Sequence, residues 1–261
     1  SMSGPHMITP PQLMCQIGLP DAPYIVDVRL PEDIGPTDRI IPTARQHDYR
    51  DTAAIIAALA GRKAVVLCHK GLKLSQGIAA LIRANGGQAE VLTGGFVAWQ
   101  EHSMPDIPCA QLPHAQVWVT RQRPKIDRIA CPWLITRFIA PDAQFMFVPR
   151  NDVMTVAERF GATAFNVPDA ICTHQDEKCS FNAILDGFNL RTDALNRMAD
   201  VIRAADTDRL DPVPQAAGLL AVSVGLSKQY RDDNAMLAAG FPIYDALYRW
   251  ARDGFSEGHA E

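Results

Sequence analysis

Hydrophobic residues in the first hundred positions alternate between short runs and helical spacing. Residues 24–28 and 64–68 are β-rich apolar runs of the length expected for parallel strands covered on both faces. Residues 52–59 are rich in alanine and isoleucine at helical spacing, and residues 75–85 carry their apolar positions on one helical face. A further strand is expected at residues 89–92. Strands that alternate with helices predict an α/β unit with a mostly parallel sheet flanked by helices.

The pattern changes near the middle of the chain. Residues 104–114 hold three prolines and little periodicity, which predicts a linker between one domain at residues 8–103 and a second at residues 115–255. The second domain is expected to be α-rich with a few strands, an α+β fold. Its predicted strands cover residues 117–119 and 145–148, and its predicted helices cover residues 132–139, 194–205, 216–226 and 242–251.

Composition narrows the class of protein. The hydrophobic share of 48%, the charged share of 21% and the net charge of -4 are ordinary for a soluble globular chain and offer no positive field to nucleic acid. No apolar run reaches the roughly 20 residues that cross a bilayer, and no signal peptide is visible, so a cytoplasmic location is expected. The 6 scattered cysteines are expected to be reduced thiols.

The clearest chemistry follows the predicted strand at residues 64–68. Cys68 ends that strand just before a helix, where parallel α/β sheets place their ligands. The next residues are expected to wrap backbone N–H groups around the sulfur and, with the helix dipole and two lysines, to favour the thiolate. The predicted anion-binding loop consists of Cys68, His69, Lys70, Gly71, Leu72, Lys73, Leu74 and Ser75, with Ser75 as a helix cap. The plain alternative is an inert cysteine beside solvated lysines.

Residues from about 8 to 100 resemble a single rhodanese domain. Asp27-Val28-Arg29 is similar to the family's strand-end Asp-x-Arg, and residues 39–44 are similar to its Ile-Pro-Gly-Ala segment. Gly94-Gly95 with Trp99 matches the family's Gly-Gly-x-x-x-Trp close.

The resemblance implies sulfurtransferase chemistry. In the family the active-site cysteine takes sulfane sulfur from a donor and passes it to a thiophilic acceptor. Carried over to this chain, Cys68 is the nucleophile that holds sulfur as a persulfide, and Asp27 and Arg29 are supporting residues. A small-molecule sulfur donor and a thiol or cyanide acceptor are the expected partners, and sulfur transfer requires no cofactor.

The loop departs from the rhodanese pattern in its length. The usual loop has serine six positions after the cysteine, whereas Ser75 is seven positions after Cys68. A loop longer by one residue resembles that of related phosphatases and arsenate reductases, yet the arginine that those enzymes carry six positions after the cysteine is Leu74 here. Lys73 supplies charge without the planar fork that holds an oxyanion bidentately. Phosphatase activity is therefore not expected, and an oxyanion reductase is a third interpretation.

The second half contains two stretches of candidate residues. A basic stretch that ends at Arg128 is expected to be a solvated face or an anion pocket. Cys131 follows at an expected helix start, where the alternatives are an activated thiol and plain core packing. His174 and Cys179 are five residues apart with acids between them, and they are candidates to share a zinc or iron ion with Asp127. Two ligands do not make a site, so the rest depends on the fold.

The segment from about residue 117 to 253 resembles the C-terminal domain of ChrB-type chromate-resistance proteins. The match is carried by residues 123–135, His174 with residues 179–181, and residues 205–207, 216–219 and 244–248. The resemblance implies a link to chromate response, as a sensor or an accessory factor, and suggests Asp127, Cys131, His174 and Cys179 as candidate residues.

Two functions from different classes stay open. The leading hypothesis is an enzyme, a Cys68 sulfurtransferase coupled to a chromate-resistance-associated domain. The alternative is an oxyanion- or metal-sensing binding protein whose rhodanese half is catalytically degenerate. An oxyanion such as chromate is a possible partner, whereas nucleic acid and membranes are not expected partners.

Overall fold

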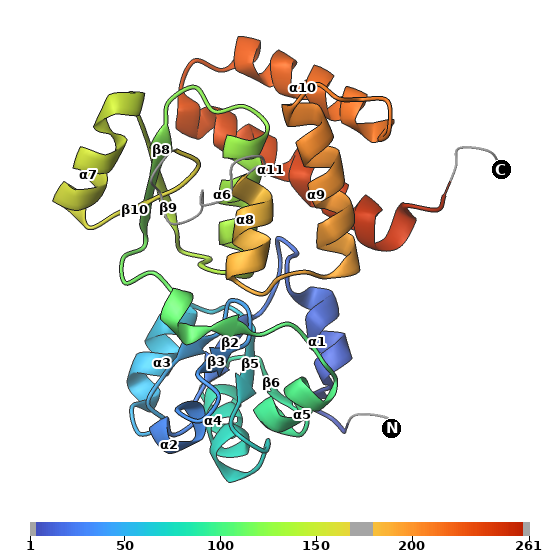
Figure 1. Cartoon of the computed structure of the whole chain (residues 1–261). Coiled ribbons are helices and arrows are strands. Elements are labelled where there is room, and N and C mark those ends of the chain that lie inside the picture. The colour runs from blue at the N-terminus through green and yellow to red at the C-terminus, as the bar shows by residue number, and fades with distance from the viewer. Residues whose placement is uncertain (1–3, 168–179, 258–261) are drawn as a thin grey trace. The chain divides into compact units, whose positions relative to one another are not determined.

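The computed structural model describes residues 4–167 and 180–257, and the chain divides into two compact units, residues 1–112 and 113–261 (Figure 1). Each unit has its own parallel sheet and its own hydrophobic core. None of the helices in the described part of the chain is both long enough and apolar enough to cross a membrane.

The first unit is built on a five-stranded parallel sheet of order β1-β6-β5-β2-β4. Its strands are β1 (Met7–Ile8), β2 (Tyr24–Asp27), β4 (Arg45–Gln46), β5 (Ala64–Leu67) and β6 (Ala89–Leu92). Its helices are α1 (Pro10–Gln16), α2 (Pro31–Ile34), α3 (Thr52–Leu59), α4 (Lys73–Ala84) and α5 (Gly95–Glu101). The α/β fold expected from the alternating pattern is confirmed.

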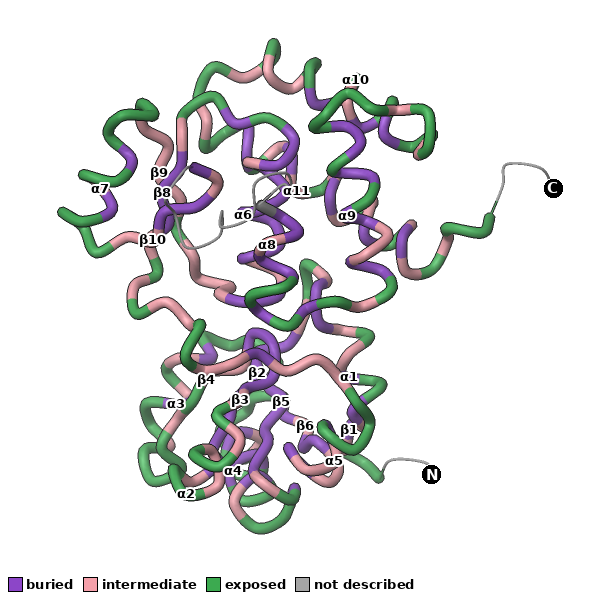
Figure 2. The backbone as a smooth tube through the Cα atoms, in the orientation of Figure 1, coloured by how far each residue is buried: buried purple, intermediate pink, exposed green. Residues whose placement is uncertain are grey.

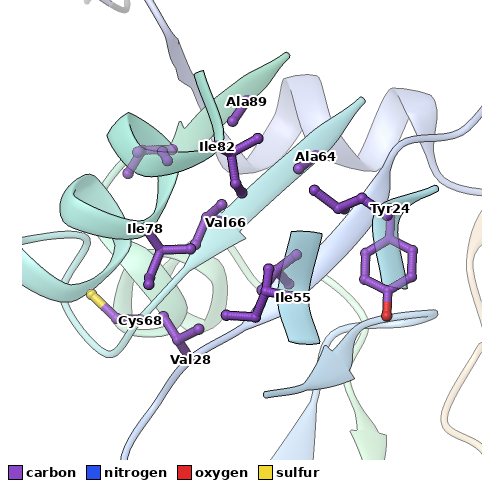
Figure 3. Packing of buried hydrophobic residues seen from close by; sticks show 13 residues of the cluster. Tyr24, Val28, Ile55, Ala64, Val66, Cys68, Ile78, Ile82 and Ala89 are labelled. Atoms are coloured by element: carbon purple, nitrogen blue, oxygen red, sulfur yellow. The ribbon is translucent and has the colours of Figure 1, made fainter. Parts of the chain in front are cut away.

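Both faces of this sheet are covered, which is why its strands are continuous apolar runs. Figure 3 shows one side of the core, where Val28 and Val66 pack with Ile55 of α3 and Ile78 of α4. Helices α1 and α5 lie on the other side of the sheet (Figure 1). Each fully buried aliphatic side chain contributes about 1.5–3 kcal/mol, so this core holds the C-terminal edge of the sheet in place.

The structure differs from the predicted linker. Ile107–Pro108 form β7, which pairs antiparallel with β3 (Arg39–Ile40), and Ile107 is fully buried. A 3-10 turn at Cys109–Gln111 follows, still within the first unit. Proline has no backbone N–H group to donate, so in sheets it is tolerated on edge strands and in short strand pairs such as this one. Pro105 and Pro108 therefore belong to a segment that packs onto the first unit, whereas Pro113 is the first residue of the second unit.

The second unit contains a three-stranded parallel sheet of order β10-β8-β9 and is rich in helix. Its strands are β8 (Val117–Arg121), β9 (Gln144–Val148) and β10 (Thr163–Ala164). Its helices are α6 (Asp127–Phe138), α7 (Val153–Phe160), α8 (Ser180–Gly187), α9 (Asp193–Asp206), α10 (Gln215–Gln229) and α11 (Asp233–Arg249), with a 3-10 turn at Arg150–Asp152 and a π-helical turn at Trp250–Gly254.

The strand order places a switch point in this second sheet. The chain runs from β8 through α6 to β9 on one side, and from β9 through α7 to β10 on the other. Figure 1 shows α6 and α7 on opposite faces of the sheet. The connections that leave the carboxyl ends of β8 and β9 therefore go to opposite faces of the sheet, and the carboxyl ends of the strands are where open α/β sheets bind ligands.

Two helices of this unit begin earlier than predicted. The sequence places Pro132 and Pro242 near helix starts, where proline is common. In the structure both prolines lie inside helices, because α6 begins at Asp127 and α11 at Asp233. An internal proline removes one backbone hydrogen bond. Burial offsets this cost in α6, in which nine of the 12 residues are buried.

Candidate active site at Cys68

Cys68 directly follows β5 at the C-terminal edge of the first sheet. The register pairs Asp27 of β2 with Leu67 of β5, so Cys68 lies opposite Val28 on the neighbouring strand. Both side chains belong to the same core cluster, and Figure 3 shows Cys68 beside Val28 and Ile78 at its edge. Only 5% of Cys68 is exposed. A reagent must therefore approach the sulfur from the loop side rather than through the core.

The hydroxyl of Ser75 is the hydrogen-bond partner of the Cys68 thiol. Ser75 is fully buried, with its Oγ 3.1 Å from Cys68 Sγ and 3.3 Å from the carbonyl oxygen of Leu72. Helix α4 begins at Lys73 with Leu72 as its N-cap residue, so the capping role predicted for Ser75 is wrong. A hydroxyl has one proton and two acceptor lone pairs. Ser75 can therefore accept from a thiol while donating to Leu72, or donate to a thiolate.

Two glycines allow the Cys68 loop to lie directly against the turn after β6. Gly71 and Gly95 adopt φ of 73° and 63°, which side chains rarely tolerate. The Phe96 N–H donates to the carbonyl oxygen of Cys68 at 3.0 Å. A Cβ added to Gly95 would lie 2.3 Å from that same oxygen and 2.6 Å from Gly71 N. Gly95 of the Gly-Gly pair is thus needed because the backbones of the Cys68 loop and of this turn touch here.

The outer side of the Cys68 loop is cationic and exposed. Lys70 and Lys73 are exposed, and neither forms a salt bridge within the part of the chain that the structure describes. Leu72 between them is 58% exposed, whereas Leu74 is half-buried against the core. His69 is half-buried, and its Nδ1 is buried without a hydrogen-bond partner. The loop presents two free positive charges around a nearly covered thiol.

Asp27 and Arg29 form a buried ion pair beneath this edge of the sheet. Arg29 Nη2 donates to Asp27 Oδ2 at 2.7 Å, its Nε contacts both carboxylate oxygens at 3.0 Å, and both side chains are 0% exposed. Nη2 also donates to the carbonyl oxygen of Arg39, and the guanidinium stacks 3.9 Å above the Phe96 ring. The pair thus connects the end of β2 to β3 through Arg39 and to α5 through Phe96. Phe96 is also the residue whose N–H bonds to the Cys68 carbonyl oxygen.

A cavity of about 410 Å³ lies beside the site and was missed by sequence reasoning. Its lining comes from the ends of β2 and β4 and from α2, and it consists of Val28, Arg29, Leu30, Pro31, Ile34, Gln46, His47, Asp48, Tyr49 and Arg50. Cys68 is not among these residues. His47 Nε2 lies 2.8 Å from the Tyr24 hydroxyl. Burial lowers the pKa of His47, Arg45 lowers it further, and Asp51 opposes them. The polar residues 46–50, which line this cavity, were the feature of the sequence that could have indicated it.

Asp127, the first residue of α6, accepts hydrogen bonds from several parts of the second unit. Asp127 is 3% exposed; its Oδ2 accepts from Asn166 at 2.9 Å and its Oδ1 accepts from the Phe181 N–H at 3.2 Å. The Cys131 thiol also donates to Oδ1, at 3.6 Å. Cys131 is fully buried in the fifth position of α6, not at the helix start. Of the two alternatives for Cys131, its complete burial supports packing in the core.

The predicted metal ligands are not brought together among described residues. His174 and Cys179 lie outside the described residues. Within residues 4–167 and 180–257, no group of three or more His, Cys, Asp or Glu side chains is arranged to hold a metal ion. The carboxylate of Asp127 instead accepts hydrogen bonds from Asn166 and from the Phe181 N–H.

The basic stretch before α6 divides into two roles. Arg123 donates to Asp233 and to the carbonyl oxygens of Ser227 and Arg231, so it braces the turn between α10 and α11. Arg128 is half-buried, and its Nε has no hydrogen-bond partner. Burial lowers the pKa of Arg128, the neighbouring charge of Arg121 lowers it further, and Asp206 and Asp127 oppose this. The expectation of a wholly solvated face is wrong for Arg128.

Helices α6 and α11 are joined by polar contacts that sequence reasoning did not foresee. Asp245 accepts from Trp133 Nε1 at 2.8 Å and from Arg137 Nε at 2.9 Å. The Tyr244 hydroxyl donates to the carbonyl oxygen of Ile126 at 3.0 Å, and burial raises the pKa of Tyr244. Ile126 holds a φ of 39°, strained for a β-branched residue. The hydrogen bond from Tyr244 holds the residue before α6 in this conformation.

The fold and the site define a chain with two parts, an α/β unit with a cysteine at a strand end and a helix-rich unit with a small parallel sheet. Residues 118–251 match the family model described as ChrB, C-terminal domain, and the chain belongs to this family. It is 36% identical over 132 residues to protein ChrB of Cupriavidus metallidurans strain CH34, a match that covers 50% of this chain and 39% of that protein. The chain thus matches well under half of that relative.

Solved structures of rhodanese-like proteins match the first unit. One is a rhodanese-related protein from Thermoplasma volcanium, at 19% identity and a TM-score of 0.34, covering 39% of this chain and 97% of that chain. Another is a thiosulfate sulfurtransferase from Pseudomonas aeruginosa, at 22% identity and a TM-score of 0.33, covering 38% and 19%. A rhodanese-like domain protein from Staphylococcus aureus matches at 26% identity and a TM-score of 0.31, covering 36% and 89%. These values assign no activity to this chain.

Proposed function

We propose that this chain is a sulfurtransferase that carries sulfane sulfur as a persulfide on Cys68, joined to a ChrB-type C-terminal domain. The observation that carries the proposal is the position of the Cys68 thiol. It lies at the carboxyl edge of a parallel sheet, 3.1 Å from the buried Ser75 hydroxyl, in a loop with two unpaired lysines. A cysteine at a strand end, with a hydroxyl partner and in a loop that carries two exposed lysines, is suited to act as a nucleophile toward an anionic sulfur donor.

The proposed reaction has two balanced displacements. In the first, the Cys68 thiolate attacks the outer sulfur of thiosulfate, a new S–S bond forms at Sγ, and the old S–S bond breaks as sulfite leaves with the electron pair. In the second, cyanide or a thiolate attacks the outer sulfur of the persulfide, and the Cys68 thiolate is the leaving group. No external oxidant is needed, because the electrons stay with the displaced groups.

Each loop residue has a distinct part in this proposal. Ser75 donates a hydrogen bond to the sulfur each time that the sulfur carries negative charge, and it keeps its proton throughout. Lys70 and Lys73 attract an anionic donor, but two lysines hold an oxyanion less firmly than an arginine fork. With Leu74 in the position that an arginine occupies in related oxyanion enzymes, we expect weak binding of thiosulfate and a correspondingly high KM.

The test is the mass of the intact protein after incubation with thiosulfate. We expect a gain of about one sulfur (~32 Da) that is removed by cyanide, absent in Cys68→Ser and retained in Cys15→Ser, whose cysteine is exposed. Ser75→Ala should slow formation of the adduct without abolishing it, because the hydroxyl assists but does not react. An adduct that survives Cys68→Ser would overturn the assignment.

The coupling of sulfur transfer to chromate response is the second part of the proposal. It is supported by the presence of both units in one chain and by membership of the ChrB C-terminal domain family. Cys68→Ser introduced into the native host should lower its tolerance of chromate. Unchanged tolerance, with the persulfide established in the purified protein, would remove the coupling and leave the enzyme.

Oxyanion binding by the second unit is the rival function, and one observation favours it. Arg121 and Arg128 lie close enough for their charges to repel, and neither forms a salt bridge in the described residues. They occupy the carboxyl edge of the second sheet, where ligands bind. Calorimetric titration with chromate and sulfate should then give binding that Arg128→Gln weakens and the exposed Lys125→Gln leaves intact. No heat of binding, or equal loss in both variants, would end this candidate.

A further inference from the structure

Strand β9 forms an open edge of the second sheet. It pairs with β8 on one side, and the order β10-β8-β9 gives it no neighbour on the other side within the described part of the chain. The Gln144 N–H donates to the carbonyl oxygen of Gln116. The Gln122 N–H donates to the carbonyl oxygen of Val148. Both ends of β9 therefore direct these backbone groups toward β8.

Two residues of β9 direct their backbone groups away from β8. The N–H and C=O groups of successive residues alternate between the two sides of a strand. Gln144, Met146 and Val148 therefore bond to β8, whereas Phe145 and Phe147 face the open side. Among the described residues, no hydrogen bond to the N–H or C=O group of either phenylalanine occurs. Residues 145–148 are intermediate in burial (Figure 2). An accessible edge with unpaired groups is a template for another strand.

A cavity lies beside this edge. The Phe145 ring is edge-on to that of Phe165, with 6.1 Å between the ring centroids. The cavity has a volume of about 280 Å³, and its wall includes Phe145 together with Leu237 and Phe241 of α11. Side chains two residues apart share one face of a strand. Phe147 therefore lies on the same face of β9 as Phe145 and the cavity.

We propose that β9 pairs antiparallel with β9 of a second copy of the chain, about a two-fold axis at Met146. Phe145 of each copy then lies opposite Phe147 of the other, and each of these pairs exchanges both of its backbone hydrogen bonds. The three-stranded sheets of the two copies become one sheet of six strands. A two-fold axis requires that the same surface serve both copies, and an edge strand paired antiparallel with itself meets this requirement.

The residues that flank β9 select this register. With the axis at Met146, Ala143 lies opposite Pro149 of the second copy. The Ala143 N–H already donates within the turn before β9, and proline has no N–H, so no donor is left unpaired there. An axis at Phe147 would set Phe145 against Pro149. An axis at Phe145 would set Phe147 against Ala143. Of these three axes, the one at Met146 alone gives every outward group of both phenylalanines a partner.

The cavity favours a second copy as the occupant of this edge. Residues in a hydrogen-bonded antiparallel pair have their Cα atoms about 5.5 Å apart and their side chains on the same face. Phe147 of the second copy therefore lies next to Phe145, beside the cavity whose wall includes Leu237 and Phe241. An aromatic ring at this position buries apolar surface and forms a cross-strand aromatic pair. Strand β9 has no charged residue, so its two copies meet without opposing like charges.

The size of the contact sets the strength of the expected dimer. A pair of five-residue strands with one inserted ring per copy is smaller than a typical stable interface, which buries about 800 Å² per partner. We therefore expect association in the micromolar range. Sedimentation equilibrium of the full chain over about 5 to 300 μM tests this by mass action. The weight-average mass should rise from 28.6 kDa toward twice that value.

Two substitutions of Phe147 should keep the chain monomeric for different reasons. Phe147→Lys places a charge at the edge and beside the cavity. Phe147→Pro removes the outward N–H, and proline is tolerated on edge strands. Phe160→Lys is the matched control and should associate as the wild type does. Phe160 is 59% exposed, and it ends α7 just before β10, at the opposite edge of the sheet.

Amide hydrogen exchange of the wild-type chain locates the contact without any substitution. The N–H groups of Phe145 and Phe147 are unpaired in a single chain, so their exchange should slow several-fold between about 5 and 300 μM as the dimer forms. A chain that stays monomeric over this range overturns the proposal. So does a dimer in which exchange in β9 is not slowed, or one that both Phe147 variants leave unchanged, because the contact would then lie elsewhere on the chain.

A cross-link tests the register. In a Cys15→Ser background, which removes an exposed thiol, Met146→Cys should form an intermolecular disulfide on oxidation with diamide. The two copies of residue 146 face each other across the axis in a non-hydrogen-bonded pair, where side chains are close. Phe160→Cys in the same background is the control and should not cross-link. A dimer that the Phe147 variants abolish, but that Met146→Cys does not cross-link, overturns the axis at Met146.

Discussion

The same fork of side chains occurs twice in the first unit. Arg29 with Asp27 and Arg50 with Asp48 are two residues apart, and in each pair Nη2 lies 2.7 Å from Oδ2. The first pair is 0% exposed on both sides, whereas the side chains of Arg50 and Asp48 are 74% and 46% exposed. Because the two pairs have the same geometry but differ in burial, comparing them shows how much burial adds to the effect of an ion pair on stability.

We expect Asp27→Ala to lower the free energy of unfolding by about 3–5 kcal/mol, because Arg29 would keep a buried charge without its counterion. Urea unfolding of the full chain measures this. The matched variant Asp48→Ala should leave the unfolding midpoint close to the wild-type value, since water screens Arg50. Equal losses in the two variants would mean that the buried pair is not special.

His47 should make the stability of the first unit depend on pH. Its pKa is lowered in the folded state, chiefly by burial and then by Arg45, from the unfolded value of about 6.5. Between these two pKa values the unfolded chain binds more protons, so stability is full above about pH 6.5 and falls as the pH drops. His47→Gln should reduce the difference between urea midpoints at about pH 7.5 and 5.5. An undiminished difference would assign the dependence to other groups.

At the scale of elements, the turn before α5 and the loop before α4 form one interlocked unit. The Phe96 N–H bonds to the Cys68 carbonyl, and Gly95 lies against the backbones of Cys68, His69 and Gly71. The position of the nucleophile is therefore set by a neighbouring turn as well as by its own loop. Helix α4 has no side-chain cap that would fix its start independently.

Gly95→Ala is expected to displace the Cys68 loop. Gly86→Ala is a matched control, because Gly86 also has a positive φ, 85°, but an added Cβ there meets nothing within 4 Å. Both variants carry the backbone penalty of about 1–2 kcal/mol; only Gly95→Ala adds the collision with Cys68. Its persulfide yield should fall at least tenfold, and that of Gly86→Ala should match wild type. Similar yields would show that the loop tolerates the shift.

At the scale of the whole molecule, the polar and reactive side chains of both units follow the carboxyl ends of parallel strands. Cys68 follows β5 of the first sheet, and Asp127 and Asn166 follow β8 and β10 of the second. Both positions are carboxyl ends of parallel strands, where loops and helix starts meet. Cys131 is fully buried, so the folded chain does not offer it as a sulfur acceptor.

The sequence by itself determined the α/β class of the first unit, the strand-end position of Cys68 and the Gly-Gly turn. These features follow from periodicity and from local backbone preferences, which neighbouring residues set. The contact between Ser75 and Cys68, the burial of the Asp27–Arg29 pair and the cavity near His47 were decided by tertiary structure. So were the interior positions of Pro132 and Pro242. Each depends on how whole elements pack against one another, because burial there supplies the free energy that outweighs local preference.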